Sequence, residues 1–184
     1  MEKTMLSTGL NLLITSVSTD FTRPQLCGIY ADTDKLVATD GHRMAVMDFA
    51  TDDKAGKLLE ANAFEKGLFA EIKDAGQYPN WKQFIPDLGK YNRYSVTIPN
   101  QLSQFKSKKQ DETRVYCYID DGRLITSLDI IKSLDALPKF SVNGAYLKAL
   151  AGQVIDLYFL DSSSPIVFKN DAQGFTYVVM PMRF

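Results

Sequence analysis

Asp40 and His42 are the two residues whose types and spacing best fit acid–base chemistry. Side chains two residues apart in a strand point the same way, as a general acid and its base must. His42 is the only histidine in the 184 residues, so a metal site or a serine triad would have to be built around it. Gly41 between them favours instead a tight turn in which His42 and Arg43 donate hydrogen bonds to the backbone. An enzyme that uses Asp40 and His42, for example a nuclease, stays an alternative to that turn.

Other catalytic signatures are absent from the sequence. It has no spaced Cys and His set, no glycine-rich phosphate loop and no nucleophile elbow. Asp120 and Asp121 precede Gly122, a pattern that favours a hairpin turn over a catalytic carboxylate pair. Both cysteines, Cys27 and Cys117, lie in apolar runs, so we expect buried thiols. We therefore expect no catalytic site, no cofactor and no metal ion.

The composition is that of a globular protein, with 45% hydrophobic and 23% charged residues and a net charge of −1. No apolar run approaches the roughly 20 residues that span a bilayer. The N-terminal residues 1–4 lack the charged-then-apolar layout of a signal peptide. We expect a cytoplasmic protein with no membrane partner.

The elements that position these residues repeat a pattern, a helix-like segment followed by two strands. In the first copy, strands at 27–31 and 35–39 join through a turn at 32–34, and a further strand spans 43–49. The helix face that precedes these strands carries Leu6, Leu10, Leu13 and Val17.

The second copy begins at Pro99, a favourable first helical residue, with Leu102 and Phe105 on one face. Its strands at 115–119 and 123–126 give the clearest hairpin signal in the chain.

In the third copy, Asn143 is the expected N-cap, Leu147 and Leu150 form the buried face, and Gly152 lies where a helix stop is expected. The strands that complete this copy lie at 157–160, 166–168 and 175–180.

An incomplete fourth copy lies between the first two, with Leu58, Leu59 and Ala63 helix-like and 68–73 strand-like. Residues 76–90 are rich in turn formers and predict a connector, with a boundary near Asp87 between domains 1–87 and 88–184. Because the strands come in pairs separated by short turns, we expect an α+β fold in which helices cover one face of antiparallel sheets. A doubly wound fold would need crossover helices between neighbouring strands.

Four segments then carry a resemblance to a known family. Residues 38–46 read ATDGHRMAV and residues 177–184 read YVVMPMRF. They resemble the ATDGHRLAV signature and the YVVMPMRL ending of the bacterial DNA polymerase III β sliding clamp family. YPNWKQFIP at 78–86 is similar to FPDYRRVLP, which joins the family's middle and last domains, and RPQLCG at 23–28 is similar to RYYLNG.

The resemblance implies a DNA-clamp fold, a closed ring in which helices line the hole and sheets form the outside. Domain 1–87 would correspond to a reduced middle domain and 88–184 to the C-terminal domain. The implied function is that of a processivity factor without catalytic activity, which encircles double-stranded DNA and holds it by sequence-independent phosphate contacts. The candidate DNA-binding residues are Arg23, Lys106, Lys108, Lys109 and Lys148. For the lysines of 106–109, a solvated helix end favoured by the helix dipole is the alternative.

The family's motifs also form a hydrophobic groove that accepts short linear peptides of DNA polymerases, the clamp loader and repair proteins. Carried over motif by motif, the groove residues are Leu26, Thr39, Gly41, His42, Arg43, Met44, Pro79, Gln83, Phe84, Val178, Val179, Met180, Pro181 and Met182. Methionines suit such a site because their flexible side chains adapt to several ligands. For Val178 and Met180, core packing is the alternative interpretation.

Three departures from the family bear on function. Gln83 stands where the family has an arginine, and Pro24-Gln25 replaces an aromatic pair, so the peptide preference is expected to differ. The family has three domains, whereas this chain has room for two. A six-domain ring would then need three copies, which favours a trimer over a dimer. The short length suggests a phage or another mobile element as its origin, and a clamp-like decoy or regulator without a ring is the rival function.

Overall fold

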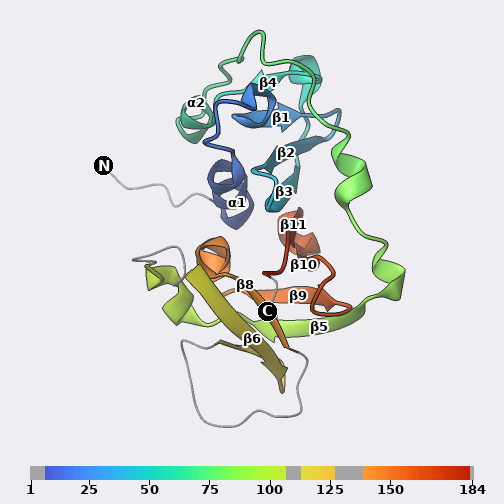
Figure 1. The fold of residues 1–184 in the computed structure, drawn as a ribbon. Helices are drawn as coiled ribbons and strands as arrows, with labels where there is room; N and C mark the ends of the chain where they lie inside the picture. The colour runs from blue at the N-terminus through green and yellow to red at the C-terminus, as the bar shows by residue number, and fades with distance from the viewer. Residues whose placement is uncertain (1–6, 107–112, 127–138, 183–184) are drawn as a thin grey trace. The chain divides into compact units, whose positions relative to one another are not determined.

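A computed structural model describes residues 7–106, 113–126 and 139–182 and divides into two compact units (Figure 1). The first unit comprises Met1–Pro86 with Asp171–Tyr177, and the second comprises Asp87–Asn170 with Val178–Phe184. The return of 171–177 to the first unit was not expected from the sequence. The assignment of 1–87 and 88–184 to two clamp domains stays a prediction.

The first unit is a small antiparallel sheet covered by a helix. In strand order β4-β1-β2-β3-β11, its sheet consists of Leu58–Leu59 (β4), Ile29–Ala31 (β1), Lys35–Thr39 (β2), Arg43–Asp48 (β3) and the start of Phe175–Val179 (β11). Its helical elements are Thr8–Ser16 (α1), Pro24–Leu26 (η1), Asp52–Lys54 (η2), Ala61–Glu65 (α2), Trp81–Phe84 (η3) and Asp171–Gln173 (η8). The strands predicted around the turn at 32–34 are confirmed, since Tyr30 pairs with Val37 and Val37 with Val46.

Helix α1 packs on β2 and β3 and is capped at its N-terminus by Ser7, whose hydroxyl accepts a hydrogen bond from the backbone N–H of Leu10. Its buried leucines are Leu12 and Leu13, whereas Leu10 is only half-buried. Leu13 is buried as predicted, but leucines occupy several sides of this short helix, and spacing alone placed the half-buried Leu10 on the buried face and missed Leu12. Val17 lies beyond the last helical residue, and Leu6 lies outside the described residues.

The prediction that Leu58 and Leu59 are helical is wrong. Both residues pair with β1, and the short helix α2 begins only at Ala61. The strand expected at 68–73 is reduced to one bridge between Leu59 and Glu71. Two apolar residues before a helix could belong to a helix or to a strand when judged from sequence alone. Here they form a strand because they pair with the edge of β1.

The second unit contains a longer sheet in strand order β11-β10-β9-β5-β7-β6-β8. Only the last two residues of β11, 178–179, belong to this unit. Its further strands are Asn92–Thr97 (β5), Arg114–Asp120 (β6), Arg123–Thr126 (β7), Lys139–Asn143 (β8), Val154–Phe159 (β9) and Ile166–Asn170 (β10). The short helices are Leu88–Lys90 (η4), Asn100–Gln104 (η5) and Gly144–Leu150 (η7). The sequence pattern predicted neither β5 nor β8.

The hairpin between β6 and β7 is confirmed. Asp121 and Gly122 have φ angles of 39° and 69°, the left-handed values that a tight two-residue hairpin turn requires. Pairing runs from Asp120 opposite Arg123 to Cys117 opposite Thr126. The thiol of Cys117 is buried as expected, whereas Cys27 is only half-buried.

The two helix-like segments of the second unit are 3-10 helices that pack on each other. Asn143 caps η7 as predicted, since its side-chain oxygen accepts a hydrogen bond from the backbone of Ala145 at 3.0 Å. Gly144 has no room for a side chain, because a Cβ there would lie 2.5 Å from Val115 and 2.8 Å from Phe105. A glycine therefore lets η7 approach the sheet. The fold is α+β, as expected, with one parallel contact between β5 and β7.

Candidate functional site

The loop between β2 and β3 is a turn organised by Asp40. One carboxylate oxygen of Asp40 accepts the backbone N–H groups of His42 at 2.9 Å and Arg43 at 3.1 Å. Gly41 has a φ of 92°, which favours glycine. The expected turn is therefore present, but the acceptor is the Asp40 side chain, where backbone acceptors were expected. The side chain of His42 is exposed.

Arg43 braces this turn and ties it to helix α1. Its Nε donates to the second carboxylate oxygen of Asp40 at 2.9 Å, and its Nη2 donates to the carbonyl of Thr15 near the end of α1. Burial works to lower the pKa of the Arg43 guanidinium, but Tyr177 and Asp40 beside it hold that pKa above its ordinary value. His42 is thus presented from a rigid support.

The connector that follows the first sheet is anchored at two points. The rings of Tyr78 and Tyr30 stack with centroids 4.6 Å apart, and the Tyr78 hydroxyl is buried without a hydrogen-bond partner among the described residues. Burial, with Tyr30 nearby, raises the pKa of that hydroxyl. Further along, the buried indole of Trp81 donates to Asp32 at 3.1 Å. Phe84, at the end of η3, is 55% exposed.

The end of β11 and the residues after it belong to the second unit. Val178 and Val179 are buried, so core packing is the better description of Val178, while Met180 is 44% exposed. The backbone N–H of Met182 donates to the carbonyl of Ser141 on β8 at 2.7 Å, and the Ser141 hydroxyl donates back to the Met182 carbonyl at 2.8 Å. These two hydrogen bonds attach Met182 to β8 at Ser141.

The predicted groove residues therefore differ in accessibility. The exposed ones are Gly41, His42, Gln83, Phe84 and Met180. The half-buried ones are Thr39, Arg43, Pro79, Pro181 and Met182. The buried ones are Leu26, Met44, Val178 and Val179, which contribute to the core.

The predicted DNA-binding residues fall in three environments. Arg23 forms an exposed ion pair with Asp20 at 3.0 Å, and its guanidinium lies 3.2 Å from the position a Cβ on Gly41 would take. Lys106 follows η5 and Lys148 lies on η7, and both are exposed on the helical layer of the second unit. Lys108 and Lys109 lie outside the described residues.

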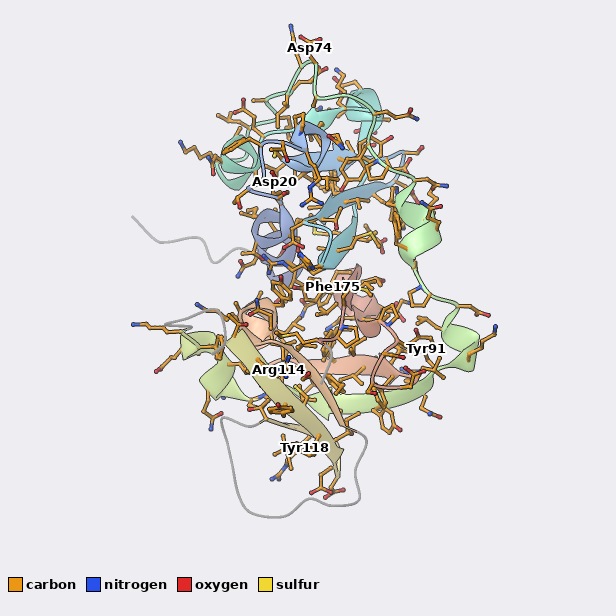
Figure 2. The ribbon with its side chains drawn as sticks, viewed as in Figure 1. Asp20, Asp74, Tyr91, Arg114, Tyr118 and Phe175 are labelled. Carbon is orange, nitrogen blue, oxygen red and sulfur yellow. The ribbon has the colours of Figure 1, made fainter. Side chains whose placement is uncertain are left out.

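Figure 2 draws the side chains of both units, with Asp20 and Phe175 labelled in the first and Arg114 and Tyr118 in the second. Phe175, at the start of β11, lies 3.5 Å from where a Cβ on Gly9 would be. This is an ordinary van der Waals distance, so the start of β11 packs against helix α1.

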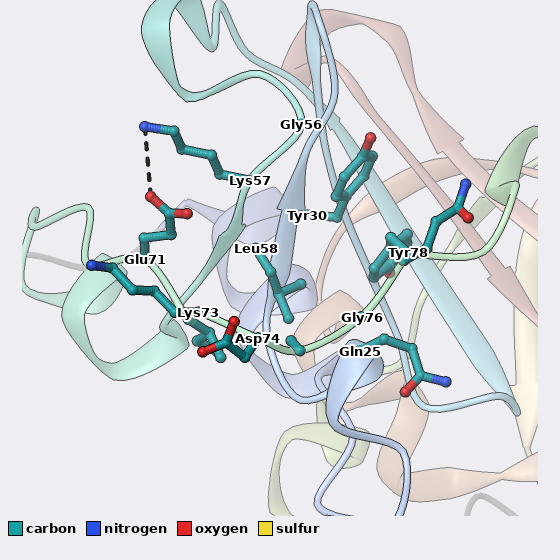
Figure 3. A pocket seen from close by; sticks show the side chains of 13 residues that line it. Gln25, Tyr30, Gly56, Lys57, Leu58, Glu71, Lys73, Asp74, Gly76 and Tyr78 are labelled. Carbon is teal, nitrogen blue, oxygen red and sulfur yellow. Dashed lines mark ion pairs between the residues drawn. The ribbon is translucent and has the colours of Figure 1, made fainter.

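A cavity of about 520 Å³ opens on the first unit between β1 and the connector (Figure 3). Its charged side chains include Lys57 and Glu71, which pair at 3.6 Å. None of the predicted site residues lines this cavity.

Asp32 anchors Trp81 and Lys82 of the connector, a role that was not predicted from the sequence. The available signal was one acidic turn residue and the single tryptophan of the chain, which are 49 positions apart. Within the described residues, no group of three or more His, Cys, Asp or Glu side chains is placed to hold a metal ion. No helix there combines the length and apolar character needed to cross a bilayer.

Comparison with solved structures decides the fold. The sliding clamp of Bartonella birtlesii bound to griselimycin matches 96% of this chain with a TM-score of 0.69 at 21% identity. The chain has the bacterial sliding-clamp fold. DNA polymerase III β subunits of Borrelia burgdorferi and Thermotoga maritima match 96% of it as well, each with a TM-score of 0.67, at 18% and 17% identity. The expected clamp fold is thus confirmed.

The matched region covers only part of each clamp, namely 64% of the Bartonella chain, 60% of the Borrelia chain and 63% of the Thermotoga chain. No protein-family model matches the sequence, and no curated protein does. The likeness to sliding clamps therefore lies in the fold.

Proposed function

We propose that this chain is a shortened DNA sliding clamp. In this role, several copies form a ring around duplex DNA, and each copy docks DNA polymerase, the clamp loader or repair proteins through short linear peptides. The chain itself carries out no chemistry. The observation that carries the proposal is the sliding-clamp fold over 96% of the chain, together with motif residues that are exposed where a peptide could reach them.

Three motif residues support the peptide-binding role. Phe84 and Met180 are large apolar side chains that are 55% and 44% exposed, and buried contact with a ligand would remove this surface from water. His42 is exposed on the turn that Asp40 and Arg43 hold rigid. A preorganised surface of this kind loses little conformational entropy when a peptide binds.

Lys106 and Lys148 support the DNA-binding role. Both are exposed, and they lie on or next to the two 3-10 helices of the second unit. The apolar residues of these helices, Leu102, Leu147 and Leu150, are buried, so the lysines occupy the outer side of the layer. Positive side chains that contact phosphates without reading bases would allow the ring to move along DNA.

An enzyme built on Asp40 and His42 receives less support. Both carboxylate oxygens of Asp40 accept hydrogen bonds from within the turn, one from backbone N–H groups and the other from Arg43. A general base must be within reach of the substrate's proton, and this carboxylate is committed to holding the loop.

A clamp-like decoy is the second candidate, because the chain spans only 60–64% of the clamps named above. Such a protein would bind polymerase peptides without encircling DNA. Three two-domain copies would supply the six domains of a ring, so the oligomeric state separates the two candidates.

Two measurements on the full chain test the proposal. Light scattering after gel filtration and class averages by electron microscopy should show a closed trimer with a central hole. Anisotropy of a labelled peptide from the C-terminus of a bacterial replicative polymerase should show saturable binding, and binding of griselimycin, which the Bartonella clamp binds, is measured in parallel. A strict monomer that binds the peptide would support the decoy, and a monomer that binds neither ligand would refute both candidates.

A further inference from the structure

The short helix η3 is weakly held by its own hydrogen bonds. Asn80, which precedes the helix, forms no side-chain cap, and the bond that closes its end, from Ile85 to the carbonyl of Lys82, is 3.4 Å long. A single turn with such bonds does not persist by itself in water. Contacts with the rest of the first unit must therefore fix its position.

Asp32 supplies these contacts. Its Oδ2 accepts the indole Nε1–H of Trp81 at 3.1 Å and lies 3.1 Å from the Nζ of Lys82. Lys82 also lies over the indole ring, with its Nζ 5.4 Å from the centroid. One carboxylate oxygen thus holds two consecutive residues of the connector.

Asp32 is itself rigid. Its backbone N–H donates to the carbonyl of Lys35 at 2.8 Å, and its own carbonyl accepts the hydroxyl of Thr51. The other carboxylate oxygen, Oδ1, accepts the backbone N–H of Thr33 at 2.8 Å. Because its N–H, its carbonyl and Oδ1 are bonded to Lys35, Thr51 and Thr33, Oδ2 is a fixed point against which the connector is positioned.

The fixed point determines where Phe84 lies. In a 3-10 helix, residues three apart share a face, so Trp81 and Phe84 lie on one side of η3 in successive turns. Trp81 is buried at the Asp32 end, and Phe84 emerges at the other end, next to Gln83. A rotation of η3 that releases the indole would therefore also move Phe84.

We propose that Asp32 is a positioning residue for partner-peptide binding, because its carboxylate locks Trp81 and thereby presents Phe84 in the orientation that binds the peptide. This inference rests on the proposed function. Asp32 does not touch the peptide and acts through the connector. Without this carboxylate, Phe84 adopts the binding orientation for only part of the time. The affinity for the peptide is reduced in proportion to the population of that orientation.

Asp32→Ala is the test variant, and Asp34→Ala is its matched control. Asp34 lies in the same turn and carries the same charge, but its exposed carboxylate contacts Lys35 at 3.5 Å. With the labelled polymerase peptide, we expect Asp32→Ala to bind about fivefold to tenfold more weakly than wild type. Asp34→Ala should bind like wild type.

Trp81 is the only tryptophan, so its fluorescence reports on the anchor directly. In Asp32→Ala we expect a red-shifted emission and stronger acrylamide quenching, both of which should be reversed by saturating peptide. In Asp34→Ala and wild type, quenching should be low with and without peptide. Because peptide binding would also refold a partly unfolded protein, circular dichroism must first show that Asp32→Ala without peptide is as folded as wild type.

Trp81→Phe guards against a failure of Asp32→Ala to fold, because it keeps a buried aromatic ring while it removes the Nε1–H donor and part of the indole surface. It too should weaken binding. Equal affinities of wild type and Asp32→Ala, or of wild type and Trp81→Phe if Asp32→Ala unfolds, would overturn this inference alone. Absence of binding by wild type to both the peptide and griselimycin would overturn the proposed function, and this inference with it.

Discussion

Arg43 and Asp40 form an ion pair of 2.9 Å whose side chains are only 14% and 18% exposed. Arg23 and Asp20 repeat the same spacing of three residues at 3.0 Å, but their side chains are 45% and 43% exposed. Water screens the second pair and reaches little of the first, so nearly identical geometry carries different energetic weight. Arg43 also bonds Thr15, which joins the turn to α1.

Replacement of Arg43 by methionine should therefore destabilise the protein by about 2–4 kcal/mol, because Asp40 keeps a half-buried charge without its partner. Arg23→Met should cost about 0–1 kcal/mol, since its pair is exposed. Urea unfolding followed by circular dichroism measures both. Equal effects of the two substitutions would contradict the importance assigned to burial.

Gly144 gives a second prediction about stability. A Cβ at this position would lie 2.5 Å from Val115 and 2.8 Å from the ring of Phe105, which are both buried. Gly144→Ala should thus cost about 1–3 kcal/mol through overpacking, despite the higher helix propensity of alanine. Gly89→Ala is the control, since the nearest neighbour of its Cβ is an exposed carboxylate oxygen of Asp87 at 3.2 Å, and it should stay within about 0.5 kcal/mol of wild type. Thermal unfolding of both variants and of wild type measures the two changes in stability, and equal changes would contradict the overpacking at Gly144.

Asp161 in the loop between β9 and β10 makes stability depend on pH. Hydrogen bonds from the side chain and backbone of Ser163, and then from Ser164, lower the pKa of this carboxyl from 3.8 to about 2. Because the folded pKa lies below the unfolded one, the stabilisation is fully present above pH 3.8 and is lost as the pH falls toward 2. Asp161→Asn should be less stable than wild type at pH 6, and the gap should close near pH 2. A gap that is independent of pH, measured by urea unfolding, would contradict this.

Local chemistry explains which elements could be predicted from sequence. Asp121-Gly122 dictates a tight hairpin turn and Asn143 caps η7, and both effects act within a few residues. Leu58-Leu59 becomes a strand because a distant strand offers its edge, and β8 exists because β6 pairs with it. A partner far along the chain leaves no mark in the local pattern.

The candidate site follows the same division. The turn at Asp40 was foreseen because its donors and acceptor are neighbours in sequence. The contact between Asp32 and Trp81 was not, because the fold alone brings the two residues together. Burial was also hidden, since Val178 and Met180 both look apolar in sequence but only Met180 reaches solvent.

Phe84 and Met180 should contribute to peptide binding without supporting the fold. Phe84→Ser and Met180→Ser are each expected to weaken binding of the labelled polymerase peptide by about tenfold, since each removes exposed apolar surface that the peptide would cover. Stability should change by less than about 1 kcal/mol because neither side chain is buried. Val154→Ser, which alters a valine that is 63% exposed and outside the predicted groove, is the control and should bind normally. If Val154→Ser weakens binding equally, the groove has been assigned to the wrong residues.

Lys106 and Lys148 should determine how DNA binding responds to salt. Each phosphate contact that is lost makes the plot of log affinity against log salt shallower by about 0.9, so Lys106→Glu with Lys148→Glu should flatten it clearly. Lys90→Glu makes the same change of charge at an exposed lysine on η4 and should leave the slope unchanged, because η4 is not part of the layer formed by η5 and η7. Anisotropy of a labelled duplex between about 50 and 200 mM salt measures the slopes. If Lys90→Glu flattens the slope as much as the double variant, DNA is attracted by overall charge, and the helical layer has no special part in binding it.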